Sequence, residues 1–203
     1  RYQHLVGQDL CKKCPKGWVQ PDRTSTGCAM CVTGKHINDM GKLYCDDCKP
    51  GKYNHEQGRA LCHDCLIGRF QPDTGVTAPL DAGGCHVCPT GWFQKATGEP
   101  ECAVCPAGWS QGTTVQGACD KCATGRQQPL VAQADCEDCM VGRFAAVQAV
   151  VNCSFCPLGF EQPAEASVDC DGCTAGRFAN ETGTVTCVQC FRGTWSGEAA
   201  AED

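Results

Sequence analysis

All 22 cysteines of this 203-residue chain lie in eleven Cys-x-x-Cys pairs, a spacing that suits three kinds of chemistry. Two such pairs can bind zinc through four thiolates, and one pair beside a βαβ unit can exchange disulfides. In an extracellular chain the same cysteines form structural disulfides. The pairs recur every 17 residues, with one interval of 23, and begin at Cys11, Cys28, Cys45, Cys62, Cys85, Cys102, Cys119, Cys136, Cys153, Cys170 and Cys187.

Structural disulfides fit the pattern better than zinc or redox catalysis. Eleven pairs cannot be divided into four-ligand zinc sites without leaving one pair over. Redox catalysis would need a thioredoxin-like context, which the sequence does not predict. We therefore predict no catalytic residue, no metal ligand and no cofactor. The histidines keep no common position in the repeat: His4, His36, His55, His63 and His86.

The residues that follow each pair predict a β-hairpin. We expect a strand of about five residues, a turn rich in Pro, Asn, Asp or Gly, and a shorter strand that returns to the next cysteine. A glycine stands three residues after the second cysteine of every pair, which predicts a positive φ, a bulge, or a backbone too close to a disulfide for any Cβ. We call it the hairpin glycine: Gly17, Gly34, Gly51, Gly68, Gly91, Gly108, Gly125, Gly142, Gly159, Gly176 and Gly193.

Three further columns recur after the hairpin glycine. The next residue is basic or aromatic in most units, the one after it is largely aromatic, and Gln follows in six units. If hairpins stack, the first column predicts cation–π contacts between successive units and the Gln column predicts an amide ladder. The alternative is that each aromatic covers its own disulfide. The glutamines are Gln20, Gln71, Gln94, Gln111, Gln128 and Gln162.

The disulfide connectivity has two candidate schemes, since sequence alone does not determine it. The favoured scheme closes each hairpin and leaves Cys11 and Cys190 without partners inside the chain; the rival links equivalent cysteines of neighbouring units, such as Cys11 to Cys28. The favoured pairs are Cys14–Cys28, Cys31–Cys45, Cys48–Cys62, Cys65–Cys85, Cys88–Cys102, Cys105–Cys119, Cys122–Cys136, Cys139–Cys153, Cys156–Cys170 and Cys173–Cys187.

Composition supports an all-β, disulfide-rich array of short hairpins that forms an elongated rod with negligible helix. Leu, Ile, Val and Phe make up only 32 residues, so covalent links must replace a large apolar core. So many cysteines favour an oxidising, extracellular location. The net charge of -6 offers no basic surface for nucleic acid, and no apolar run is long enough to insert into a membrane.

The repeat organises the whole chain. Residues 1–10 form a partial repeat, and residues 11–203 form eleven tandem repeats, of which the last is incomplete. A six-residue insertion at 76–84 is a candidate contact loop through Val76, Pro79 and Leu80. Because both ends cut a unit, we expect the array to continue, or Cys190 to meet Cys11 of another molecule in a self-associating fibre.

Single units resemble known extracellular modules. The run Cys14-Pro15-Lys16-Gly17-Trp18 through Cys28, and the run from Cys48 through Cys62, resemble ephrin-receptor-like repeats and the first half-module of tumour-necrosis-factor-receptor cysteine-rich domains. Both belong to the growth-factor-receptor cysteine-rich superfamily. The resemblance implies a disulfide-linked hairpin rod on a cell surface, and it carries over no ligand site. Unit lengths vary in those receptors, whereas this chain keeps its period.

The period therefore favours a structural role. We predict a non-catalytic extracellular fibre, filament or surface stalk, because identical contacts that do not close propagate along an axis. The alternative is a receptor or adhesin ectodomain that binds a protein or glycan. Two Asn-x-Ser/Thr sequons, at Asn180 and Asn152, are candidate N-glycosylation sites.

Overall fold

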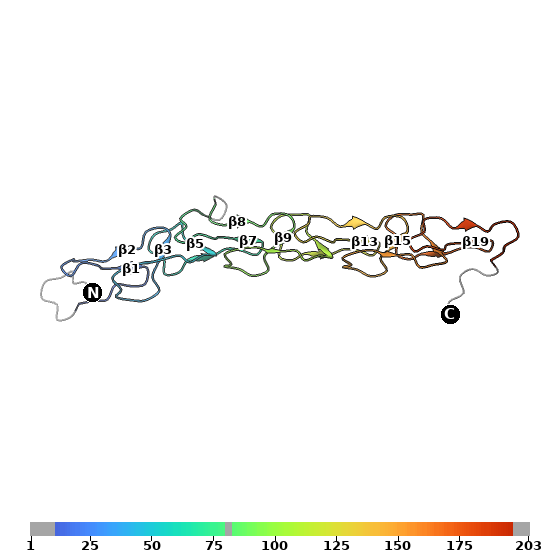
Figure 1. Cartoon of the computed structure of the whole chain (residues 1–203). Coiled ribbons are helices and arrows are strands. Elements are labelled where there is room, and N and C mark those ends of the chain that lie inside the picture. Colours follow the sequence, from blue (N-terminus) through green and yellow to red (C-terminus); the bar gives the residue numbers. More distant parts are fainter. Residues whose placement is uncertain (1–10, 80–82, 197–203) are drawn as a thin grey trace. The chain divides into compact units, whose positions relative to one another are not determined.

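The computed structural model describes residues 11–79 and 83–196, which contain twenty two-residue strands and no helix (Figure 1). Each strand pairs with a neighbour in the chain to form a separate two-stranded sheet. The sheets are β1 (Trp18–Val19) with β2 (Ala29–Met30), β3 (Lys35–His36) with β4 (Asp46–Asp47), β5 (Lys52–Tyr53) with β6 (His63–Asp64), β7 (Arg69–Phe70) with β8 (His86–Val87), β9 (Trp92–Phe93) with β10 (Ala103–Val104), β11 (Trp109–Ser110) with β12 (Asp120–Lys121), β13 (Arg126–Gln127) with β14 (Glu137–Asp138), β15 (Arg143–Phe144) with β16 (Ser154–Phe155), β17 (Phe160–Glu161) with β18 (Asp171–Gly172), and β19 (Arg177–Phe178) with β20 (Val188–Gln189).

The hairpins are confirmed, but their strands are shorter than predicted and the return strand lies elsewhere. In β11–β12, Trp109 is opposite Lys121 and Ser110 is opposite Asp120 in an antiparallel pair. The return strand therefore consists of the two residues between the cysteines of the next pair. The outgoing strand ends before Gln111, because the Gln111 N–H already donates to the Gln133 carbonyl of the next unit.

Ten disulfides close the ten hairpins, and they join the same cysteines as the hairpin-closing scheme. Their Cα–Cα distances lie between 5.7 and 5.9 Å, and nine span 14 residues while Cys65–Cys85 spans 20. Cys11 and Cys190 are free cysteines, the first exposed and the second partly exposed. The six extra residues of the insertion thus enlarge one disulfide loop and leave the geometry of its bridge unchanged.

The chain forms two compact parts, and the same backbone contacts join the units inside each. Among the described residues, the first part runs to Pro89 and also holds Phe93–Ala103 and Thr114–Ala118; the second holds the rest. In the second part the hairpin glycine Gly108 donates its N–H to the carbonyl of Gln128 at 2.8 Å, one unit further on. Equivalent bonds run from the other hairpin glycines between Gly17 and Gly176, so a main-chain hydrogen bond joins each of these units to its successor.

At the hairpin glycines from Gly17 to Gly142, a second contact joins a unit to the one after its successor. Gly108 has a φ of 81°, and a Cβ built on it would lie 2.3 Å from the carbonyl oxygen of Ala149. In the first part a Cβ on Gly17 would lie 1.9 Å from the carbonyl oxygen of Gly58. The positive φ predicted for the hairpin glycine is therefore confirmed, and the atoms that leave no room for a Cβ belong to a turn carbonyl of another unit rather than to a disulfide.

The residue that approaches the hairpin glycine also adopts a positive φ, whether or not it is glycine. We call it the turn residue: Gly41, Gly58, Gly75, Gly98, Val115, Ala132, Ala149, Ala166 and Gly183, with φ between 55° and 78°. Its N–H donates to the carbonyl of the second cysteine of the preceding unit, as from Ala132 to Cys105 at 2.9 Å. That bond holds four non-glycine residues in a conformation that costs about 1–2 kcal/mol each.

The core consists of disulfides with one or two side chains against each. Tyr53 packs on the Cys65–Cys85 bridge of the next hairpin, together with Val76. Val19 likewise packs on Cys31, in the next hairpin. The prediction that an aromatic covers the bridge of its own hairpin is therefore wrong for Tyr53, whose own hairpin is closed by Cys48–Cys62. Side chains of this column link successive units instead.

The close approach at Gly108 predicts that Gly108→Ala is far more destabilising than Gly176→Ala. Both glycines have φ near 80°, so both variants carry the left-handed strain of about 1–2 kcal/mol. Only Gly108 meets the backbone of another unit, whereas no described atom lies within 4 Å of the Cβ position of Gly176. Differential scanning calorimetry is expected to show at least twice the loss for Gly108→Ala, and equal losses would contradict the contact.

The strained turn residues predict that Ala149→Gly stabilises the protein. Relief of the left-handed strain exceeds the added entropy of the unfolded chain, so we expect a gain of about 0.5–1 kcal/mol in unfolding free energy. Ala146→Gly is the control, because Ala146 is exposed and its φ is not positive. Calorimetry of both variants tests this, and destabilisation by Ala149→Gly would show that the turn is unstrained.

Candidate functional site

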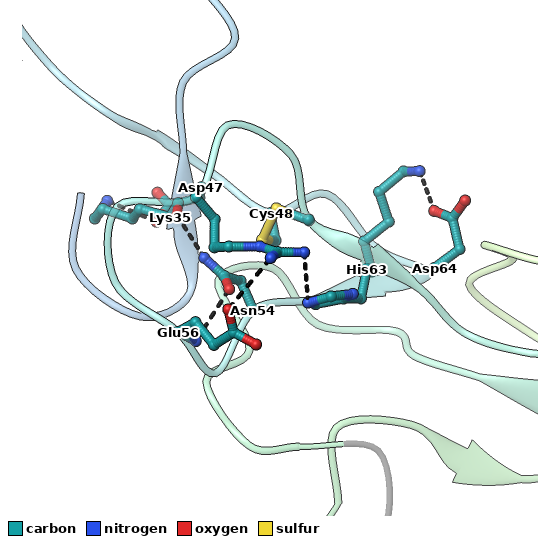
Figure 2. The surroundings of a disulfide bond; sticks show 10 residues. Lys35, Asp47, Cys48, Asn54, Glu56, His63 and Asp64 are labelled. Atoms are coloured by element: carbon teal, nitrogen blue, oxygen red, sulfur yellow. Dashed lines mark hydrogen bonds and ion pairs between the residues drawn. A yellow bond between two sulfur atoms is a disulfide. The ribbon is translucent and has the colours of Figure 1, made fainter. Parts of the chain in front are cut away.

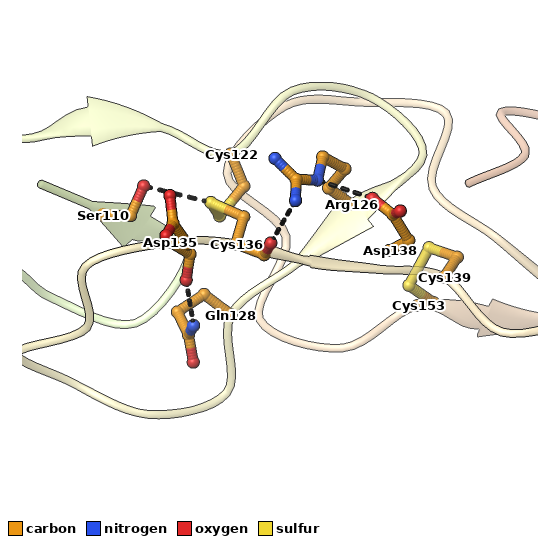
Figure 3. A network of polar contacts seen from close by, with 9 residues as sticks. All are labelled: Ser110, Cys122, Arg126, Gln128, Asp135, Cys136, Asp138, Cys139 and Cys153. Carbon is orange, nitrogen blue, oxygen red and sulfur yellow. Dashed lines mark hydrogen bonds and ion pairs between the residues drawn. A yellow bond between two sulfur atoms is a disulfide. The ribbon is translucent and has the colours of Figure 1, made fainter. Parts of the chain in front are cut away.

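A buried glutamine braces the turn inside its own unit. Gln128 is 2% exposed, and its Nε2 donates to the Asp135 carbonyl at 2.6 Å (Figure 3). Its Oε1 accepts from the Leu130 N–H at 3.0 Å. Gln94 and Gln162 make the same two bonds, to the residues seven and two positions further on. The predicted amide ladder between units is therefore wrong, since these amides bond to the backbone of their own loops.

The basic or aromatic column finds its partners across each hairpin. Lys35 Nζ lies 2.6 Å from Asp47 Oδ1 (Figure 2), and Arg126 Nε lies 2.6 Å from Asp138 Oδ1 (Figure 3). Lys52 pairs with Asp64 in the same register. These pairs are largely exposed and each contributes on the order of 1 kcal/mol or less. In these three hairpins a cation of the column therefore lies opposite an aspartate of the return strand.

Cation–π contacts occur in the same cross-strand register. Lys121 Nζ lies 5.4 Å from the centre of the Trp109 ring, and the Arg143 guanidinium carbon lies 3.8 Å from the centre of the Phe155 ring. Each cation is opposite its aromatic partner in a two-stranded sheet. The prediction placed cation–π contacts between residues of this column in successive units. The two observed contacts instead join a residue of the column to a residue between the cysteines of the next pair, within one hairpin.

Polar residues in the aromatic column bind the first cysteine two units further on. Gln127 Oε1 accepts from the Cys153 N–H at 2.7 Å, and Glu161 accepts in the same way from Cys187. The Ser110 hydroxyl lies 3.3 Å from Sγ of Cys136 and donates to it (Figure 3). Sequence reasoning missed this role because it described the column by its aromatics. The signal was the placement of Ser, Gln and Glu among them.

Two groups of side chains have metal-ligand chemistry. His36 lies beside Cys48 and Cys62, but those sulfurs are joined in a disulfide and offer no thiolate. In the other group the ligand atoms of His55, Glu56 and His63 lie within 4.8 Å of one another. The prediction of no metal ligand did not consider this group, because it rested on the absence of a histidine that recurs at the same position of every unit.

The remaining predicted residues are accessible in different degrees. Val76 is half-buried against Tyr53, and its carbonyl accepts from the Asn54 N–H at 2.9 Å, so it stabilises the fold. Pro79 is exposed, and Leu80 lies outside the described residues. Asn180 and Asn152 are both exposed on loops, so both sequons remain candidates for N-glycosylation.

One segment of the chain matches a known protein family. Residues 75–118 match the family described as tyrosine-protein kinase ephrin type A/B receptor-like, and no curated protein matches the chain. The segment includes the insertion, and the hairpin and disulfide pattern found there recurs throughout the described residues. The chain is a tandem array of cysteine-rich repeats, of which the segment 75–118 is similar to this receptor family.

Receptor-like repeats with so many disulfides indicate an extracellular or cell-surface location. The family is typically non-enzymatic. In the part of the chain that the structure describes, we find no helix long and apolar enough to cross a membrane. What these repeats offer is a regular, cross-linked backbone with variable side chains on its surface.

The brace predicts that Gln128→Ala leaves the hairpin folded but loosens its turn. Ala145 and Ala179 occupy this position naturally, so the fold tolerates alanine. Loss of both bonds is expected to cost about 1–3 kcal/mol and to speed amide exchange in residues 129–135. Hydrogen–deuterium exchange measures this, with Gln148→Ala as the exposed control. Unchanged exchange at Leu130 would show that the brace contributes nothing.

Proposed function

We propose that this chain is a structural component of an extracellular fibre, filament or surface stalk. The observation that carries the proposal is the repetition of the same two backbone contacts, from each unit to the next and to the one after it. Both contacts are heterologous, since the donor surface differs from the acceptor surface. Heterologous contacts that do not close on themselves extend without limit, as in solenoids and filaments.

The contacts are suited to extension because they depend little on side chains. The hydrogen bonds use main-chain N–H and carbonyl groups, and the close approach requires only that one residue lack a Cβ. Disulfides then lock each hairpin, which compensates for the small apolar core. Such units stack in any number, so we expect the array to continue beyond residues 11–203.

The free cysteines supply a covalent route to continuation. Cys190 donates its N–H to the Gly176 carbonyl at 2.9 Å, the same bond that the bridged second cysteines from Cys31 to Cys173 make. Cys11 is exposed and stands where a first cysteine would meet the second cysteine of a preceding unit. A Cys190–Cys11 disulfide would link two molecules head to tail, and thiol–disulfide exchange with an oxidised low-molecular-weight disulfide would form it, so that two electrons and two protons leave on the reduced thiols of that reagent.

This proposal predicts covalent head-to-tail oligomers of the 203-residue chain under oxidising conditions. Non-reducing electrophoresis is expected to show multiples of 21.6 kDa, and peptide mapping an intermolecular Cys190–Cys11 link. Cys11→Ser and Cys190→Ser should each stop growth at a disulfide dimer or a monomer. Electron microscopy should show filaments of the parent. Monomers with both thiols still reactive, and no filaments, would contradict self-association.

A second function, a receptor or adhesin ectodomain, has one specific observation in its favour. The segment that matches the ephrin receptor-like family, residues 75–118, begins at the single insertion in the period. Pro79 is exposed in that insertion. Replacing residues 76–84 with a three-residue loop of the standard unit length separates the two proposals. Filament formation would survive the replacement, whereas binding of a ligand at the insertion would be lost.

A further inference from the structure

One hairpin gathers imidazole and carboxylate groups that the repeat does not require. His63 lies in β6 opposite Tyr53 in β5, and their rings stack with centroids 5.3 Å apart. The His55 ring stacks on the other two, with its centroid 5.6 Å from that of His63 and 6.0 Å from that of Tyr53. Glu56 Oε1 lies 3.5 Å from His55 Nε2. Two imidazoles and a carboxylate therefore share one edge of the hairpin.

The loop that presents His55 and Glu56 is held by a fully buried asparagine (Figure 2). Asn54 occupies the position that Gln takes in six other units. Its Nδ2 donates to the Lys35 carbonyl of the preceding unit at 2.8 Å, and its Oδ1 accepts from the Glu56 N–H at 3.1 Å. His63 follows Cys62, which is bridged to Cys48. The backbone on both sides of the cluster is thus anchored before any ligand arrives.

A cationic group already occupies the centre of the cluster. One terminal nitrogen of Arg59 lies 3.2 Å from Nε2 of His63, and the other lies 3.3 Å from Oε2 of Glu56. Since guanidinium only donates, the Nε2 of His63 is the acceptor in this contact. The lone pair of His63 and the carboxylate of Glu56 therefore converge on one positive centre, as they would on a metal ion.

We propose that His55, Glu56 and His63 form a binding site for a borderline divalent transition metal, with Zn²⁺ as the ion to test. Two histidines and one glutamate leave a fourth position for water in tetrahedral Zn²⁺ coordination. Metal–ligand bonds of about 2.0–2.2 Å place such ligand atoms about 3.4 Å apart, so the cluster closes by on the order of 1 Å. Rotation of the partly exposed side chains allows this, and Arg59 swings outward.

The site is specific to one hairpin. His86 occupies the same position as His63 in the next unit and lies beside Phe70, with ring centroids 5.5 Å apart. No second histidine accompanies it in the described residues. His86 therefore shares the location and the aromatic contact of His63 without the other two ligands, which makes it a matched control.

Isothermal titration of Zn²⁺ into the oxidised chain tests the site, in a Cys11→Ser/Cys190→Ser background that removes both free thiols. We expect one Zn²⁺ per chain, with affinity at least tenfold lower in His55→Ala and in His63→Ala and unchanged in His86→Ala. Arg59→Gln removes the competing cation and should tighten binding about tenfold. The variant keeps the bond from the Ile37 N–H to the carbonyl of residue 59, because that bond uses no side-chain atom.

Two outcomes would overturn the proposal. The first is no Zn²⁺ binding by either the parent or the Arg59→Gln variant. The second is Zn²⁺ binding that persists in the His55→Ala/His63→Ala double variant. Disulfide mapping of each variant verifies that the hairpins are closed. The site is independent of the fibre proposal, since the cysteine background is monomeric by design.

Discussion

The approach of a turn carbonyl to a glycine that lacks a Cβ is the constraint on which the rest of the structure depends. It brings the backbone of every second unit together, as at Gly108 and Ala149, at a distance where no side-chain atom fits. The neighbouring N–H of the hairpin glycine then reaches the carbonyl one unit ahead. Conformational freedom at one residue therefore determines the spacing of units, and the disulfides stabilise an arrangement that the backbone has already specified.

The small core follows from this constraint. Backbones that pack so closely leave little volume for large side chains, so sulfur atoms and single aromatics fill what remains. Most of the larger apolar side chains are exposed or half-buried. Disulfides stabilise such a fold in an oxidising environment, because each restricts the unfolded chain without requiring interior volume. The Gln brace has the same advantage, since it satisfies buried backbone groups of its own loop.

The sequence was sufficient to predict the elements and insufficient to predict their contacts. Regular spacing gave the hairpins, the disulfide scaffold and the special role of the hairpin glycine. The predicted strand length was wrong because the N–H groups of Gln111 and its equivalents donate to the next unit. The sequence of one hairpin does not reveal such a bond. The predicted amide ladder was wrong for a related reason. A column of identical residues indicates equivalent environments, but it does not reveal whether the side chains hydrogen-bond to each other or to the backbone of their own loops.

The same separation between backbone and side chains explains how function can vary along the array. The two contacts that recur along the array use main-chain atoms, so a residue such as His55, which takes no part in them, can change without cost to the period. Asn54 shows the limit of that freedom, since it replaces the usual Gln yet still holds the loop, by bonding to the preceding unit instead. A unit can therefore acquire a ligand-binding edge while it keeps its main-chain contacts with neighbouring units. A regular period and a local binding site are compatible properties of one chain, because different atoms carry them.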